Sequence, residues 1–203
     1  MKVEACPQCG APAGVAAKHC LYCKAEFVVA SFADLQSIAD AGVQKYVNAY
    51  RGAVRANPND AEAHVSLGLC YLRLGLFDLA QKAFLTAAET APECGDAYFW
   101  SACAATKGRR LKSIPLADVR KMEEYVNAAL AVDFNHPSYI GFAALIKRDC
   151  YRLNGLRVEP PTEIEFLQKM TANRARDSKL NDLLGLVKTS DEEFVAQLRS
   201  VTS

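Results

Sequence analysis

The clearest pattern of apolar and polar positions lies between Ala61 and Cys94, where small and large apolar residues recur at helical spacing. The positions that carry the pattern are Leu67, Gly68, Tyr71, Gly75, Ala80, Phe84, Ala87 and Pro92. Gly68 and Ala80 would let two helices approach closely, because neither residue has a long side chain. Larger apolar side chains would fill the groove between them, and Pro92 would end the second helix. The pattern predicts two antiparallel helices joined by a turn near Gly75.

These residues resemble a tetratricopeptide repeat, a unit of about 34 residues made of a helix, a turn and a second helix. His64 stands where the family usually has Trp, and we expect it to fill a core position rather than to bind a ligand. The resemblance covers roughly residues 31 to 175 and is strongest over 61 to 94. It implies a mainly α protein, a right-handed α-solenoid in which stacked units bury one another's faces.

Weaker copies of the pattern flank the clear unit. Tyr50, Ala53 and Pro58 repeat it one period earlier, which predicts a helix over residues 43–56 after a degenerate first helix over 31–42. Tyr98 and the residues after it begin a third unit. Its second helix resumes only after an insertion of about eight residues, and Phe134 replaces the usual closing Pro.

A fourth helix pair is predicted over residues 138–153 and 162–174, separated by turn signals at Asn154-Gly155 and Pro160-Pro161. Beyond it, the run that starts at Ser190 reads as a capping box that opens a final helix through Leu198. The predicted organisation is a zinc ribbon over 1–29, a linker helix and degenerate repeat over 30–59, repeats over 60–175, and C-terminal capping helices over 176–203.

The most specific chemistry of the sequence is a set of four cysteines near its start, Cys6, Cys9, Cys20 and Cys23. A gap of two residues lets a tight turn direct two thiolates at one ion, and two such knuckles complete a tetrahedron. We therefore expect one structural Zn²⁺ with no open position for water or substrate. The segment resembles a short zinc ribbon, a small β module.

Two other interpretations of these cysteines were weighed. A Cys-x-x-Cys pair serves redox chemistry in some proteins, but two pairs within eighteen residues favour a metal. His19 is an alternative ligand beside Cys20, yet four thiolates already fill the coordination sphere. Lys24 stands where such ribbons usually have Gly, which predicts a mildly strained backbone there.

The composition of the chain limits which partners and which cellular location are expected. The 203 residues are 51% hydrophobic and 23% charged with a formal net charge of +1, so no global charge draws the chain to nucleic acid or to an anionic membrane. We expect neither a membrane span nor a signal peptide, and thiolate zinc ligands favour the reducing cytoplasm. The other cysteines, Cys70, Cys94, Cys103 and Cys150, are expected to behave as small buried apolar residues.

The resemblance also implies a place for a partner, because the first helices of the units line a concave groove that holds a peptide or helix. The residues of those helices that face the groove are Glu62, Val65, Leu69, Leu72, Arg73, Phe99, Trp100, Cys103 and Lys107. An apolar groove with Trp100 as its main contact would suit an amphipathic helix of a protein partner. The alternative is that Phe99 and Trp100 pack in the core.

A basic segment offers a second kind of partner. It contains Lys107, Arg109, Arg110, Lys112, Arg120 and Lys121 against the single acid Asp118, and Lys147, Arg148, Arg152 and Arg157 follow against Asp149. An anionic partner such as nucleic acid is therefore an alternative, although charged loops are usually only solvated and no aromatic residues alternate with these charges. Self-assembly is a further alternative.

Catalysis is not expected. The sequence has no phosphate-binding glycine loop, nucleophile elbow or paired-His metal motif, and a closed four-thiolate site excludes substrate. The sequence therefore predicts a cytoplasmic, non-catalytic adaptor or scaffold that holds a protein partner in a multiprotein complex.

Overall fold

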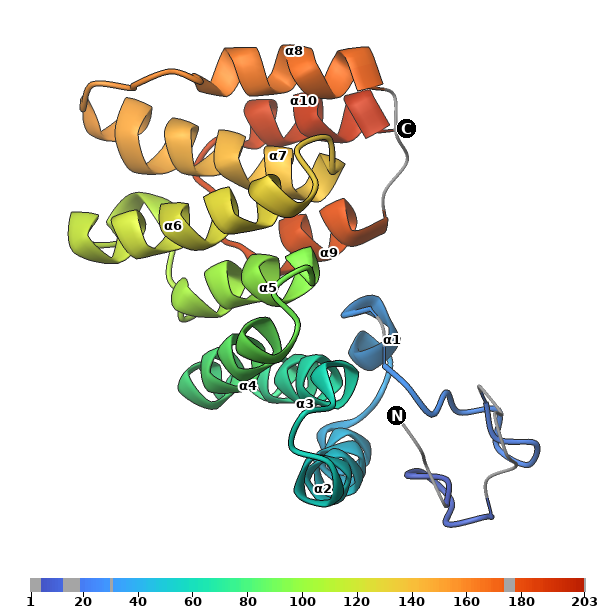
Figure 1. Ribbon diagram of the computed structural model, residues 1–203. Helices are drawn as coiled ribbons and strands as arrows, with labels where there is room; N and C mark the ends of the chain where they lie inside the picture. Colours follow the sequence, from blue (N-terminus) through green and yellow to red (C-terminus); the bar gives the residue numbers. More distant parts are fainter. Residues whose placement is uncertain (1–4, 13–18, 30, 174–177, 203) are drawn as a thin grey trace. The chain divides into compact units, whose positions relative to one another are not determined.

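The computed structural model describes residues 5–12, 19–29, 31–173 and 178–202, which are mainly helical (Figure 1). The chain divides into two compact units, Met1–Pro92 and Glu93–Ser203, and each is described by itself. The boundary falls inside the stretch that the sequence predicts as one array of repeats. Among the described helices, none is long and apolar enough to cross a membrane.

The predicted helix pair of the first unit is confirmed by α3 (Ala61–Arg73) and α4 (Phe77–Thr90), which pack against each other. Asp60 caps α3 by accepting a 2.9 Å hydrogen bond from the amide of Ala63. Gly68 lies so close to Phe84 that a Cβ atom at Gly68 would be 2.4 Å from the ring. Gly75, with φ of +71°, makes the turn between the helices.

The preceding repeat is shorter than the pattern predicts. Its second helix is α2 (Asp40–Ala56), which packs against α3 and buries Tyr50 completely. Its first helix is a single turn, α1 (Ala33–Gln36), with reciprocal 3.3 Å hydrogen bonds between the backbone amides and side chains of Ser31 and Asp34. The degenerate first helix expected over 31–42 is thus reduced to one capped turn.

The second unit begins with α5 (Gly95–Ala105) and α6 (Leu116–Val132), which pack together as the third helix pair. The insertion between them contains the short 3₁₀ helix η1 (Leu111–Ser113), whose Leu111 is fully buried. Leu111 therefore joins the insertion to the core of the unit, while Lys112 and Ser113 beside it are exposed.

The fourth pair consists of α7 (Pro137–Leu145) and α8 (Glu163–Asn173). From α7 the chain continues through a π-helical turn, η2 (Ile146–Tyr151), and a 3₁₀ turn, η3 (Arg152–Asn154). Gly155, with φ of +69°, ends this run, as the turn signal predicts.

Two further helices close the unit, α9 (Ser178–Leu186) and α10 (Glu192–Thr202). α9 packs against α7, while α10 packs against α8 and lies beside it in Figure 1. The N-cap of α10 is Asp191, which accepts a 3.0 Å hydrogen bond from the amide of Phe194. The predicted final helix is present, and its cap lies one residue after Ser190.

Candidate metal centre and partner surface

The two cysteine knuckles have the same backbone turn. In the first, the amide of Cys6 donates to the carbonyl of Ala11 at 2.7 Å, and the amide of Gly10 donates back to the carbonyl of Cys6 at 2.9 Å. In the second, the amide of Cys20 donates to the carbonyl of Ala25 at 2.8 Å, and the amide of Lys24 donates to the carbonyl of Cys20 at 3.0 Å. Each turn ends on a residue with positive φ, +75° at Gly10 and +61° at Lys24. The unfavourable backbone predicted for Lys24 is present.

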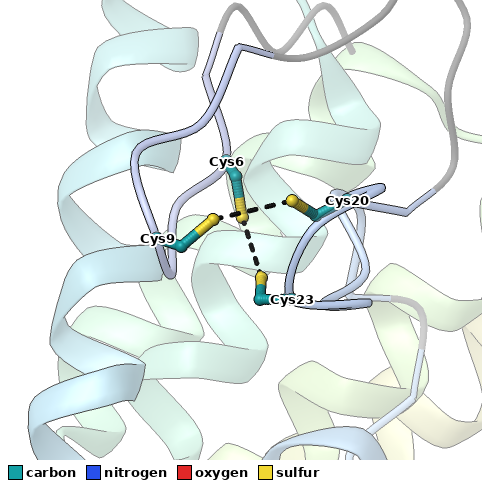
Figure 2. A group of neighbouring side chains, drawn as sticks. All are labelled: Cys6, Cys9, Cys20 and Cys23. Carbon is teal, nitrogen blue, oxygen red and sulfur yellow. Dashed lines mark hydrogen bonds between the residues drawn. The ribbon is translucent and has the colours of Figure 1, made fainter.

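The paired turns bring all four thiols to one point, as Figure 2 shows. Their sulfur atoms all lie within 4.8 Å of one another, with Cys6 and Cys23 at 3.5 Å and Cys9 and Cys20 at 3.6 Å. None of the eight cysteines, all of which are described, forms a disulfide. Thiolates bound at about 2.3 Å to one tetrahedral zinc ion would be about 3.8 Å apart, so the cluster fits such an ion.

The thiols of Cys20 and Cys23 do not ionise equally in the absence of a cation. Backbone amides of Cys23 and Tyr22 that point at Cys20 lower the pKa of its thiol to about 6. At Cys23 the amide of Ala25 favours the thiolate, but lost hydration and the three other thiols raise the pKa to about 12. A dication placed among the sulfur atoms would stabilise all four thiolates together, because it cancels their mutual repulsion.

The remaining cysteines have a different environment. Cys70, Cys103 and Cys150 are buried in helical segments, as expected, whereas Cys94 is half-buried at the start of α5. Burial raises the pKa of the Cys70 and Cys150 thiols to about 12. These thiols remain neutral, which suits small apolar core residues and not metal ligands.

The cysteine module has little core of its own. Cys6, Cys20 and Phe27 form its buried cluster, against which Ala11 and Ala25 pack. Within residues 5–12 and 19–29 the expected β structure is reduced to two isolated antiparallel bridges, one of them between His19 and Glu26. His19 is exposed and is not among the clustered ligands, as expected. The metal would therefore supply much of the order of this module.

The module packs on α2 through two tyrosines that the sequence analysis did not single out for this role. The hydroxyl of Tyr46 donates to the carbonyl of Glu26 at 2.9 Å. One helical turn later, the hydroxyl of Tyr50 donates to the carbonyl of Phe27 at 3.1 Å and accepts from the amide of Val29 at 2.9 Å. Both rings are almost completely buried. The two bonds of the Tyr50 hydroxyl are buried and so shielded from water, whereas the Tyr46 bond is only partly buried.

The first knuckle also contacts α2. Gln8 donates from its side-chain amide to the carbonyl of Gly42 at 3.2 Å, and Lys45 donates to the backbone carbonyl of Gln8 at 3.0 Å. Both knuckles are thus fixed to the same helix. The sequence left open whether this module packs on the helices or docks onto a second partner, and these bonds place it on α2.

Five of the residues predicted for partner binding are core residues. Leu69 and Leu72 of α3 and Phe99 and Trp100 of α5 are each 2% exposed or less. Phe99 lies at the centre of an aromatic cluster, with ring centroids 4.9 Å from Trp100, 5.3 Å from Tyr139 and 6.1 Å from Phe142. Cys103 is also fully buried. These side chains offer no surface to a partner.

The other predicted residues lie at or near the surface. Glu62 is exposed and Val65 half-exposed on α3, and Lys107 is exposed after α5, with φ of +51°. Arg73 has a structural role, since its guanidinium donates to the carbonyls of Leu35 and Ile38 at 3.2 Å. It also lies 3.2 Å from a carboxylate oxygen of Asp40.

Much of the basic charge of the second unit is paired within the unit. Arg109 lies 2.9 Å from Asp118, and Arg110 donates to the carbonyl of Thr189 at 3.1 Å. The later basic residues all have acidic neighbours, in the pairs Lys147–Glu123, Arg148–Asp191, Arg152–Glu163 and Arg157–Glu159. This pairing leaves less positive potential for a nucleic-acid backbone than the sequence suggests.

The fold and the cysteine cluster define a helical-repeat protein with a four-cysteine N-terminal module. A model of the tetratricopeptide repeat family matches the chain over residues 47–80 and again over 71–113. Residues 47–113 therefore carry tetratricopeptide repeats, which support a general role in protein–protein interaction and belong to a generally non-catalytic class of domain. No curated protein sequence matches the chain.

Proposed function

We propose that this chain is a non-catalytic adaptor of the cytoplasm, in which a zinc ribbon is fixed to tetratricopeptide repeats that bind a segment of a protein partner. The observation that carries the proposal is the family match over residues 47–113, together with the exposed Glu62 and the half-buried Val65 on α3 of that segment. Acidic and apolar groups side by side suit a helix with one apolar and one basic face.

Zinc is the metal proposed for the cysteine cluster. Four thiolates in a tetrahedral arrangement are a usual ligand set of structural zinc, and the site has no position left for water or substrate. Cys6, Cys9, Cys20 and Cys23 would hold the ion, whose role would be to order the module rather than to act on a substrate. A reducing cytoplasm keeps such thiols free of disulfides.

The test of partner binding uses the zinc-loaded full chain to capture proteins from its native host. Glu62→Arg reverses the charge at the outer face of α3, and Lys82→Glu, an exposed residue of α4, is its control. We expect a set of proteins that the wild type and Lys82→Glu capture and that Glu62→Arg loses at least tenfold. Equal capture by all three chains would place the partner elsewhere.

The alternative, association with nucleic acid through residues 107–121, makes a different prediction. Phosphate-driven binding weakens steeply with salt, so titration of a random duplex at rising salt detects it. We expect no association at physiological salt. Light scattering at two concentrations tests self-assembly in the same samples, and a concentration-independent mass argues against it.

A further inference from the structure

In the second unit, the chain itself covers the surface that α5 and α7 share. The covering segment is α9 with the residues that lead to α10, residues 178–191, here called the C-terminal latch. α9 packs against α7, and Lys179 at its start lies 2.5 Å from Asp96 of α5. The latch therefore contacts the first helices of two successive helix pairs.

The apolar contact of the latch comes from a short row of side chains. Leu180, Leu183 and Val187 follow one another at helical spacing and are each 4% exposed or less. Gly141 of α7 lets α9 approach closely, because a Cβ atom there would be 2.7 Å from the Leu180 side chain. The row fits α7 as one face of an amphipathic helix fits a groove.

A charged contact fixes the start of the latch. Asp96 receives hydrogen bonds from the hydroxyl of Tyr139 at 2.8 Å and from the ammonium group of Lys179. The Lys179 and Asp96 side chains are 23% and 30% exposed, so water and salt reach this ion pair. The pair sets the direction and register of α9 on the surface. Because water reaches it, a basic group of another segment could replace Lys179 beside Asp96.

The other end of the latch meets the insertion and the π-helical turn. The amide of Ser190 donates to Asp149 at 2.6 Å, Arg148 lies 2.7 Å from Asp191, and the amide of Leu111 donates to the carbonyl of Lys188 at 2.9 Å. This contact is incomplete. In the described part of the chain, one oxygen of the fully buried Asp149 and the hydroxyl of Ser190 have no hydrogen-bond partner. Unsatisfied buried polar groups disfavour the closed state.

The latch also lacks stability of its own. α9 is 9 residues long, and an isolated helix of that length is marginal in water, so its helical form depends on the surface beneath it.

We propose that the latch is an intrachain ligand of the α5/α7 surface, and that an amphipathic helix of a partner replaces it. The replacing helix would carry a basic residue followed by apolar residues one, four and eight positions later, as Lys179, Leu180, Leu183 and Val187 do. The inference rests on the proposed partner binding, and it specifies the kind of partner segment that the second unit would bind. The first unit would bind its partner independently of the latch.

The test uses a fluorescein-labelled peptide with the sequence of residues 178–202 and the full zinc-loaded chain. Leu183→Asp in the chain would release its own α9, since a charge replaces a fully buried leucine. The peptide should then bind this variant at least tenfold tighter than the wild type. Asn181→Ala changes an exposed residue of the same helix and should behave as the wild type. A peptide that itself carries Leu183→Asp should not bind.

A second variant guards against loss of folding. Lys179→Ala removes the charged contact with Asp96 and leaves the buried apolar row in place, and it should raise the affinity for the labelled peptide several-fold at low salt, with a smaller effect at high salt. An unlabelled alanine-rich helix with Lys, Leu, Leu and Val at the same spacing should displace the labelled peptide. Hydrogen exchange should show residues 178–191 less protected in both variants while α5 and α7 stay protected.

Two results would overturn the proposal. One is equal peptide affinity of the wild type and both variants. The other is loss of hydrogen-exchange protection across α5 and α7 in both variants, because α9 would then be an integral core helix. Capture of a partner through Glu62 would be unaffected by either result, so the failure of this inference is distinct from failure of the proposed function.

Discussion

Tyr46 donates a hydrogen bond to the backbone carbonyl of Glu26, three residues after the last cysteine of the cluster. This bond fixes the second knuckle to α2. Tyr46→Phe would keep the ring and remove the bond, leaving the carbonyl of Glu26 without this donor. We expect a loss of about 1 kcal/mol in the stability of the packed module, seen as faster hydrogen exchange in residues 19–29.

The control for this change is Tyr22→Phe. The Tyr22 ring lies within the second knuckle but is 75% exposed, so loss of its hydroxyl should leave hydrogen exchange unchanged. Similar effects of the two substitutions would argue that the Tyr46 bond does not fix the module.

The cysteine cluster predicts about one zinc ion per chain. Cys9→Ser should abolish binding and disorder residues 5–29, while helical circular dichroism is largely retained because the helices bury their own faces. Metal analysis and circular dichroism check both parts. Cys70→Ser, a buried thiol outside the cluster, should retain the zinc. Collapse of the helical signal on zinc loss would contradict the division into a metal module and self-supporting helices.

The contact between Gly68 and Phe84 predicts opposite effects for two glycine-to-alanine changes. Gly68→Ala would push a methyl group into the Phe84 ring and should destabilise the first unit by about 1 to 3 kcal/mol. Gly52→Ala in α2 meets nothing within 4 Å and should stabilise its helix by up to about 1 kcal/mol. Denaturant unfolding measures both changes, and stabilisation by both would show that the helices are less closely packed.

Burial of Trp100 predicts a large loss of stability on truncation. Trp100→Ala should destabilise the second unit by about 3 to 5 kcal/mol, because the cavity beside Phe99 cannot fill completely. Leu116→Ala, at the 40% exposed start of α6, should change thermal unfolding little. Weakened partner capture without a fall in melting temperature would mean that Trp100 lies in an open groove.

Glu163 predicts a loss of stability in acid. Burial alone would raise its pKa, but the Arg152 guanidinium, 2.6 Å away, lowers the pKa below its usual range. A carboxylate with a lowered folded-state pKa stabilises the fold above its unfolded pKa of about 4.3, and this contribution is lost as the pH falls through the folded value. Glu163→Gln should therefore unfold with less pH dependence below about pH 4.

Glu159→Gln is the matched control for that experiment. Glu159 pairs with Arg157 at 2.8 Å, but their side chains are 63% and 86% exposed, so water screens the pair. Its replacement should leave the pH dependence of unfolding unchanged, and an equal effect of both variants would contradict a special role for Glu163.

Sequence patterns predicted the parts of the fold that depend on local spacing. Gly68, Gly75 and Phe84 mark one helix pair because close approach, a turn and a filled groove each need a particular residue type. The cysteine cluster was equally predictable from the sequence, since two Cys-x-x-Cys knuckles close together seldom serve a purpose other than metal binding.

Contacts between distant segments were not predicted. Tyr50 was correctly expected in the core as the counterpart of Phe84, yet its hydroxyl bonds to Phe27 and Val29, a pairing that no periodicity encodes. The place of Trp100 was difficult to predict for another reason. The α5 helix is apolar on all its faces, so its sequence does not indicate which face would meet a partner. Capping helices were expected over 176–203, but α9 was given no bounds of its own, since it is short and its order depends on tertiary packing.

The unequal ends of the two knuckle turns have a consequence for assembly. Gly10 adopts positive φ without steric cost, whereas Lys24 does so at a cost of about 1 to 2 kcal/mol. The backbone hydrogen bonds of the two knuckles are otherwise the same, so this cost falls on the second knuckle alone. Part of the binding free energy of a metal ion would therefore go into holding Lys24 in its left-handed conformation.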